Sequence, residues 1–204
     1  MKILIATKNL GKTRETKEIL GDFFDCVSLV DLRGSPEIEE TGKTFEENSF
    51  LKAKSYFDWS AIPTIADDGG LEIDALHGEP GVLSRRWPSF AEASEGKPGR
   101  EKTDEELIQI ALQKLQGVPR EKRTARLRVV VTYHDGTRTL SDSQSIEGYI
   151  MERVTAKCEP GYPFRAIFWI PEHKKLFQDL THNEHEAINH RRRALKNIAE
   201  KILK

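Results

Sequence analysis

The sequence predicts an α/β protein, with an elongated mixed central sheet flanked by helices and two lobes with a cleft between them. Three observations favour this fold class. An apolar strand, a glycine-containing turn and a helix follow one another at the start of the chain, as in many α/β folds. A His-Asp-Gly-Thr hairpin signal at 134–137 adds an antiparallel part. The 204 residues, 37% of them hydrophobic, suffice for one core, so residues 1–204 are expected to form a single domain.

Hydrophobic spacing and breaker residues give the order of the elements. The apolar segment Ile3–Ala6 predicts a strand, and the polar segment after it predicts a helix to about Leu20. Thr44 and Glu47 form a capping box, which predicts a helix to about Asp58. Further strands are expected at 26–30, 64–66, 126–133, 138–150 and 166–170, further helices at 104–115 and 190–204, and an irregular excursion at 77–102.

Composition and charge exclude several classes of protein. The formal net charge is −1, so neither nucleic acid nor a membrane surface is expected as a partner. No apolar run approaches the roughly 20 residues that cross a bilayer. Cys26 and Cys158 lack metal-ligand spacing and are interpreted as reduced structural thiols. We therefore expect a soluble cytoplasmic protein.

The first candidate site is the turn after the first strand, Thr7-Lys8-Asn9-Leu10-Gly11-Lys12. A helix N-terminus presents unpaired N–H groups and the positive end of its dipole, and both favour phosphate. Lys8 and Lys12 add positive charge, and Gly11 allows close approach of the backbone. The spacing is not that of a Walker A loop. An ordinary βα turn with two surface lysines is the alternative from this segment alone.

The second candidate site is Asp67-Asp68-Gly69-Gly70, directly after the strand expected at 64–66. Adjacent carboxylates suit a hard cation that prefers oxygen ligands. Successive residues of an extended chain point to opposite sides, so one aspartate is expected to face the cleft while the other ties down the turn. A polar turn with a capping aspartate is the alternative.

Two further charged segments leave their roles open. Glu37, Glu39 and Glu40 either contribute a carboxylate to a metal site with Asp68 or form a solvated acidic loop. The run 189–193 (Asn-His-Arg-Arg-Arg) opens the last helix, where basic residues oppose the macrodipole. An anionic ligand would explain that placement, and ordinary surface contacts are the alternative. The near-neutral net charge disfavours nucleic-acid binding through these arginines.

Together, and in this order, these segments resemble the inosine triphosphate pyrophosphatase family, which clears damaged purine nucleotides. The resemblance spans nearly the whole chain, and its central run is long and specific. The matching blocks are Thr7-Lys8-Asn9-x-Gly11-Lys12, Glu39-Glu40-Thr41-Gly42-x-Thr44-Phe45-x-Glu47-Asn48-x-x-x-Lys52-Ala53, Ala66-Asp67-Asp68-x-Gly70-Leu71-x-Ile73-x-Ala75-Leu76-x-Gly78-x-Pro80-Gly81-Val82, Ser84-Arg85-Arg86-Trp87, Ile167-Phe168-x-Ile170-Pro171 and His190-Arg191-x-x-Ala194-Leu195.

The resemblance implies Mg²⁺-dependent cleavage between the α and β phosphates of a nucleoside triphosphate, by a homodimer with a substrate cleft. By position it implies that Glu39 and Asp68 hold the metal and that Asp68 is the base for the attacking water. Asp68 and Lys12 are thus the expected catalytic residues. The expected substrate-binding residues are Thr7, Lys8, Asn9, Gly11, Lys12, Lys52, Gly69, Tyr162, Phe164, Arg165, His185, His190 and Arg191.

The chain departs from the family pattern around the substrate. Gly69 stands where a serine is usual, and Arg165 stands where the family's G-F-G-Y-D-P segment has its aspartate. His185 replaces a lysine, and Asn189 replaces a serine. A changed donor and acceptor pattern discriminates strongly between bases. We expect a modified or non-standard purine nucleotide as substrate, with a different base or a catalytically weakened nucleotide-binding module as alternatives.

Overall fold

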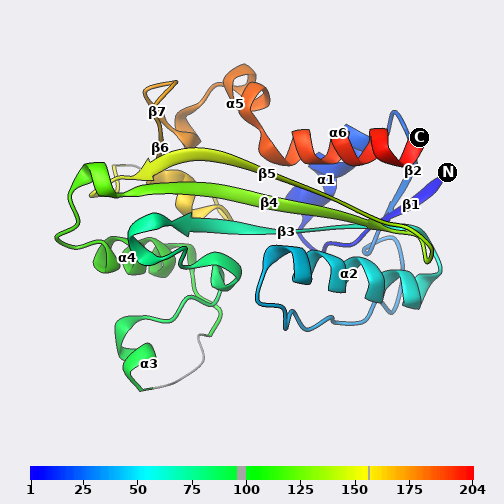
Figure 1. Cartoon of the computed structure of the whole chain (residues 1–204), viewed down its shortest axis with the longest axis horizontal. Helices are drawn as coiled ribbons and strands as arrows, with labels where there is room; N and C mark the ends of the chain where they lie inside the picture. Colours follow the sequence, from blue (N-terminus) through cyan, green and yellow to red (C-terminus); the bar gives the residue numbers. More distant parts are fainter. Residues whose placement is uncertain (96–99, 156) are drawn as a thin grey trace. The chain divides into compact units, whose positions relative to one another are not determined.

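The computed structural model of the protein describes residues 1–95, 100–155 and 157–204. Within these residues, seven strands form one mixed sheet in the order β2-β1-β3-β4-β5-β6-β7, and helices flank it (Figure 1). This confirms the predicted α/β class. The chain divides into two compact units. Unit 1 comprises residues 1–69, 129–144 and 190–204, and unit 2 comprises residues 70–128 and 145–189.

The strands of unit 1 begin with a parallel trio. β1 (Lys2–Ile5) pairs in parallel with β2 (Asp25–Ser28) on one side and with β3 (Thr64–Ile73) on the other. β4 (Thr124–His134) and β5 (Thr139–Ile150) form the predicted hairpin and run through both units. The helices of unit 1 are α1 (Leu10–Leu20), α2 (Phe45–Ser60) and α6 (His190–Leu203).

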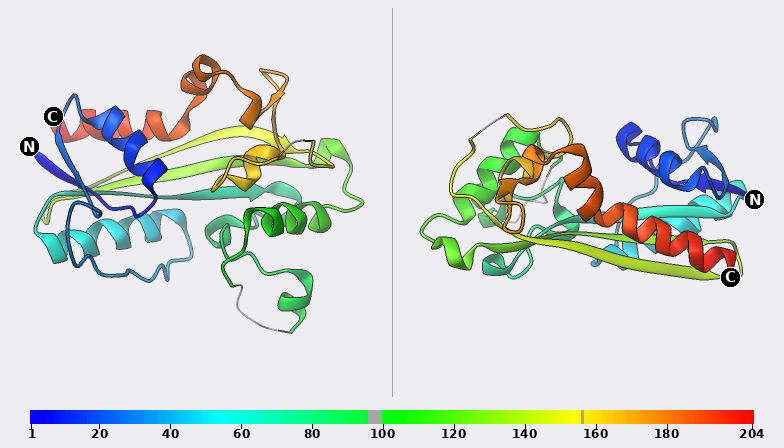
Figure 2. Two further views of the ribbon diagram at one scale, coloured as in Figure 1. Left: turned by 180° about the vertical axis from the view of Figure 1, so that it is seen from behind. Right: turned by 90° about the horizontal axis from the view of Figure 1, so that it is seen from above.

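Alternation along β1 gives unit 1 two apolar cores. Ile3 belongs to a cluster with residues of α1 and α6, whereas its neighbour Leu4 packs with Ala53 and Tyr56 of α2. Successive side chains of a strand point to opposite faces, so one short strand anchors helices on both sides. The views of Figures 1 and 2 agree that α1 and α6 lie together on one face and α2 on the other.

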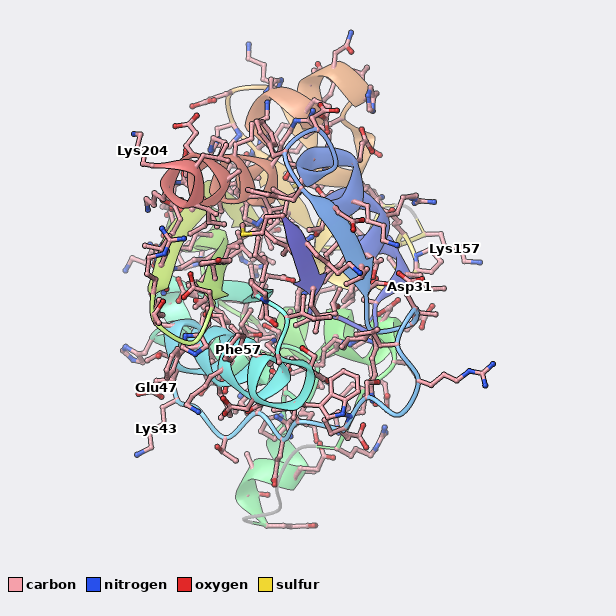
Figure 3. All side chains as sticks on the ribbon, turned by 90° about the vertical axis from the view of Figure 1, so that its right-hand side faces the viewer. Asp31, Lys43, Glu47, Phe57, Lys157 and Lys204 are labelled. Carbon is pink, nitrogen blue, oxygen red and sulfur yellow. The ribbon has the colours of Figure 1, made fainter. Side chains whose placement is uncertain are left out.

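Capping fixes the start of α2, as the sequence predicts. The Thr44 hydroxyl accepts the N–H of Glu47 at 3.1 Å. The Glu47 carboxylate in turn accepts the N–H of Lys43, one residue before the cap. The side chains of both residues are labelled in Figure 3. These bonds satisfy donors that a helix N-terminus otherwise leaves unpaired.

The predicted end of β3 at Ala66 is wrong, because the strand continues to Ile73. Asp67 and Asp68 therefore lie inside a strand and not in a turn. The second of the two glycines that follow, Gly70, leaves room for a close neighbour, since a Cβ there would lie 2.1 Å from the Ser84 hydroxyl oxygen. Gly70, which was interpreted as part of a turn, is thus the position where the segment containing Ser84 approaches the strand closely.

Unit 2 surrounds its own core of buried side chains, which includes Trp87, Leu107 and Phe168. The strand predicted to begin at 166 begins at Phe168, because residues 163–166 form a 3₁₀ turn that Pro163 favours. The helices of this unit are α3 (Phe90–Ser94), α4 (Asp104–Lys114) and α5 (His182–Ile188), its short strands are β6 (Phe168–Ile170) and β7 (Lys175–Leu176), and its 3₁₀ helices are Asp74–Leu76, Gly81–Leu83, Arg120–Lys122, Pro163–Ala166 and Phe177–Asp179.

The excursion predicted at 77–102 is less irregular than expected. It contains the 3₁₀ helix Gly81–Leu83 and the short helix α3, which Ser89 caps. Residues 96–99 of this segment lie outside the described residues. In the part of the chain that the structure describes, no helix is both long and apolar enough to cross a membrane.

The core of unit 1 yields a prediction about stability. Ile198 on α6 is fully buried, whereas Leu203 on the same helix is 60% exposed. We expect Ile198→Ala to lower the free energy of unfolding by about 2–4 kcal/mol, because it removes buried methyl groups and leaves a cavity. Leu203→Ala is the matched control and should change it by less than about 0.5 kcal/mol. Urea unfolding at pH 7 measures both, and equal losses would contradict the assigned core.

Candidate active site

The predicted phosphate loop is built as a helix cap. The Asn9 side-chain oxygen accepts the N–H groups of Gly11 at 2.9 Å and Lys12 at 3.1 Å, so Asn9 is the N-cap of α1. The N–H of Asn9 donates to the Thr7 hydroxyl at 3.2 Å. Four predicted residues thus meet in one turn, while Lys8 beside them is exposed. The turn lies at the positive end of the α1 dipole, where an anion is stabilised.

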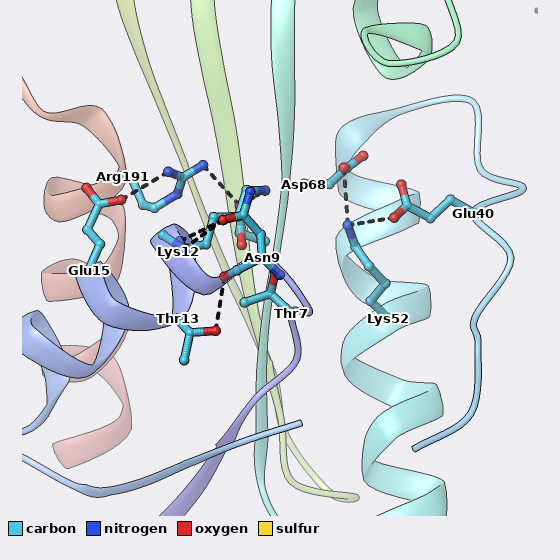
Figure 4. A network of polar contacts seen from close by, with 11 residues as sticks. Thr7, Asn9, Lys12, Thr13, Glu15, Glu40, Lys52, Asp68 and Arg191 are labelled. Carbon is cyan, nitrogen blue, oxygen red and sulfur yellow. Dashed lines mark hydrogen bonds and ion pairs between the residues drawn. The ribbon is translucent and has the colours of Figure 1, made fainter. Parts of the chain in front are cut away.

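Asp67 is the centre of one ionic cluster of unit 1. Its Oδ2 accepts from Lys12 Nζ at 2.8 Å and from an Arg191 guanidinium N–H at 3.3 Å. Arg191 also donates to Glu15 on α1 at 3.1 Å (Figure 4). Burial alone would raise the pKa of Asp67, but Lys12 and Arg191 outweigh burial and hold that pKa well below its ordinary 3.8. Asp67 therefore anchors the helices that carry these cations.

Asp68 belongs to a second cluster. Lys52 of α2 donates to Asp68 Oδ1 and to Glu40 Oε1, at 3.2 Å in each case (Figure 4). The other oxygen of Asp68, Oδ2, is buried, and no hydrogen bond reaches it from the described residues. Because a buried carboxylate oxygen ordinarily has a partner, this atom marks a place where a ligand would bind.

One cation faces two carboxylates in this second cluster. Burial raises the pKa of Asp68, and Glu40 adds to the rise, while Lys52 opposes it only in part. Burial would lower the pKa of Lys52, but Asp68, Asp67 and Glu40 together raise it. The formal charge of Lys52, Asp68 and Glu40 sums to −1, so the cluster favours one more cation.

The acidic loop places its glutamates differently from the expectation. Ile38 packs into the core beside α2, Glu39 is exposed, and Glu40 points back to Lys52. Alternation of an extended segment explains this order, since residues two apart share a side. The structure thus brings Glu40, and not the predicted Glu39, to Asp68. Reading the alternation from the apolar Ile38 would have selected Glu40 from the sequence.

Two predicted residues open α6. His190 is half-buried and Arg191 is buried. The prediction assigned Arg191 to the nucleobase, whereas its guanidinium here contacts Asp67 and Glu15. Sequence analysis missed both acidic partners of Arg191. The spacing of Lys12 and Glu15 on one helix face was the available signal.

Apart from Gly69 in β3, the remaining predicted residues lie in unit 2, where Arg165 stacks on Tyr162. The Arg165 guanidinium carbon lies 3.8 Å from the centre of the Tyr162 ring and 4.9 Å from that of Phe177. An ion pair with Glu159 at 2.9 Å holds the guanidinium, and His185 meets Phe177 edge-on. The predicted Phe164 is buried against Trp87 instead. A planar cation is thus fixed with N–H donors available along its edge.

A family model described as the Ham1 family matches residues 3–201. The chain belongs to the Ham1 family. Its relatives include a Bacillus cereus protein named dITP/XTP pyrophosphatase, 39% identical over 204 residues, 98% of this chain and 94% of that protein. A Bacillus subtilis protein of the same name is 38% identical over 199 residues, 97% of this chain and 94% of that protein.

Two solved structures of Ham1 proteins resemble this Ham1-family chain closely. The Staphylococcus aureus protein has a TM-score of 0.84 at 30% identity, covering 99% of this chain and 98% of its own. The Coxiella burnetii protein has a TM-score of 0.85 at 30% identity, covering 100% and 98%. The comparisons therefore confirm the predicted family and fold class.

The two aspartates of this Ham1-family protein should differ in their effect on stability. We expect Asp67→Asn to lower the free energy of unfolding at pH 7 by about 3 kcal/mol, because Lys12 remains buried without its carboxylate and Arg191 keeps only the ion pair with Glu15. A depressed pKa stabilises the fold above the unfolded value near 4. The deficit of the variant should therefore shrink as the pH falls from about 5 to about 3.

Asp68→Asn is the control for that measurement. The pKa of Asp68 is raised, so this carboxylate gives no such stabilisation of its ionised form. Urea unfolding across the pH range measures both variants. A larger loss for Asp68→Asn, or a deficit of Asp67→Asn that grows towards low pH, would contradict the assignment.

Proposed function

We propose that the chain is a nucleoside triphosphate pyrophosphatase, which hydrolyses its substrate to the monophosphate and pyrophosphate. The observation that carries the proposal is the buried, unsatisfied oxygen Asp68 Oδ2 in a cluster of net charge −1. In the same unit the N-terminus of α1, with Lys8 exposed beside it, offers an anion the positive end of the helix dipole. The activity named for the curated relatives, dITP/XTP pyrophosphatase, supports the same reaction.

We infer that Mg²⁺ is the cation, held by Asp68 and Glu40. Within the described residues no group of three or more His, Cys, Asp or Glu side chains could hold a metal. That fits Mg²⁺, which is commonly held by one or two carboxylates and completes its shell with water and substrate phosphate oxygens. Asp68, with its unsatisfied Oδ2, and Glu40, which accepts from the same lysine as Asp68, supply those two carboxylates.

The residues of the chain have distinct roles in the proposed reaction. When bound, Mg²⁺ lowers the pKa of its water and offsets phosphate charge. Asp68 is the proposed base, which accepts the proton of the attacking water. Lys12 and Lys52 oppose the charge that spreads over the phosphate oxygens. Asp67 keeps Lys12 in place.

For substrate, we propose a non-standard purine nucleotide, with Arg165 taking part in base selection. The Tyr162–Arg165 stack offers an aromatic face and fixed N–H donors, which suit a base rich in carbonyl acceptors. The names of the relatives, with dITP and XTP as substrates, point to such bases. The homodimer and the contacts of Lys8, Gly69, His185 and His190 with substrate stay predictions.

Removal of Asp68 or of the metal tests the proposed reaction. We expect Asp68→Asn to lower kcat by at least about 10²-fold, since the base is lost. Nucleotide affinity should change much less, and EDTA should abolish turnover reversibly. Pyrophosphate release from a panel of normal and modified nucleotides measures the rate. Persistent nucleotide binding with no pyrophosphate from any of them would instead support a binding module.

Base selection by Arg165 is tested with two matched substrates. XTP differs from ITP by an added carbonyl, so a guanidinium donor should favour XTP. We expect Arg165→Ala to lower the XTP-to-ITP ratio of kcat/KM by about tenfold, the effect of one charged hydrogen bond. Arg165→Lys keeps the charge without the planar fork and serves as the control. An unchanged ratio in both variants would remove Arg165 from base selection.

A further inference from the structure

The acidic loop, residues 36–43, is fastened along one face of α2. Asn48, Lys52 and Tyr56 are spaced four residues apart on that helix and so share a face. Each of them contacts the loop, and the contacts follow the loop backwards as the helix runs forwards. The loop therefore lies antiparallel to α2, with Glu40 at the middle contact.

The contacts at either end of the face are hydrogen bonds to the loop backbone. Asn48 Oδ1 accepts the N–H of Gly42 at 2.8 Å, and the Tyr56 hydroxyl donates to the carbonyl of Pro36 at 3.1 Å. Asn48 is 1% exposed and Tyr56 is 5% exposed. A buried side chain is costly to leave without its hydrogen bond, so these two contacts hold the loop on α2.

The loop packs too tightly on α2 to slide. A Cβ added at Gly42 would lie 2.6 Å from Asn48 Oδ1 and 2.7 Å from Glu47 Cβ. Between the two backbone contacts, Ile38 packs into the core cluster that includes Ala53. The loop is thus fixed on both sides of Glu40, whose own side chain is 35% exposed.

We propose that Asn48 and Tyr56 are positioning residues, which set the place of the Glu40 carboxylate and so the affinity of the site for a divalent cation. The inference rests on the proposed metal site at Asp68 and Glu40. Neither residue contacts the carboxylate pair, and both act through the loop backbone. Residues that orient metal ligands typically change metal affinity by about 10–100-fold when they are replaced.

The test measures binding of Mn²⁺ alone to the intact protein, by the electron paramagnetic resonance signal of the free ion. Asn48→Ala and Tyr56→Phe are each expected to weaken Mn²⁺ binding by about tenfold. Ser49→Ala is the matched control. Ser49 is adjacent on α2, fully buried, and loses a hydrogen bond of 2.8 Å to Thr132 without touching the loop. Its Mn²⁺ affinity should match that of the wild type.

Hydrogen–deuterium exchange tests, without metal, how firmly Asn48 and Tyr56 hold the loop. Exchange across residues 36–43 should be faster in Asn48→Ala and Tyr56→Phe than in Ser49→Ala. Equal exchange in all three variants, or Mn²⁺ affinities equal to the wild type, would overturn the inference. If Asp68→Asn binds Mn²⁺ as well as the wild type, the proposed metal site itself fails. The exchange measurement then still decides whether Asn48 and Tyr56 hold the loop in place.

Discussion

Two neighbouring carboxylates can be buried in a strand only where cations pair with them. The ion pairs around Asp67 and Asp68 in unit 1 meet that requirement. Asp67 and Asp68 follow each other in β3 and contact different partners. α1 and α6 bring Lys12 and Arg191 to the first, and α2 brings Lys52 to the second. The strand therefore selects which helices lie on either side of it.

The two clusters differ in charge, and the difference defines their uses. Asp67 and Glu15 balance Lys12 and Arg191, which gives a neutral cluster that anchors the N-terminal turns of α1 and α6. Lys52 alone meets Asp68 and Glu40, which leaves an excess of negative charge and an unsatisfied oxygen. The alternation of β3 places these two environments at adjacent residues, and the triphosphate and metal ion of the proposed reaction would use both.

Local signals were read correctly where the chemistry is local. The caps at Asn9 and Thr44 follow from a side chain that bonds backbone groups two or three residues away. The end of β3 was misread, because Asp and Gly usually mark a turn. Here Asp68 and Gly70 stay in the strand because they contact Lys52 and Ser84, which lie outside the local sequence.

Within the candidate site, the sequence by itself determined the family, the capped turn that opens α1 and the aspartate pair. These depend on residue order and on spacing along one strand or one helix. Only the tertiary structure decided that Glu40 reaches Asp68, that Arg191 contacts Asp67, and that Arg165 stacks on Tyr162. Each of these contacts joins separate elements, so its formation depends on how the elements pack. Charge and shape where two elements pack decide which side chains contact each other, and no pattern within one element predicts such a contact.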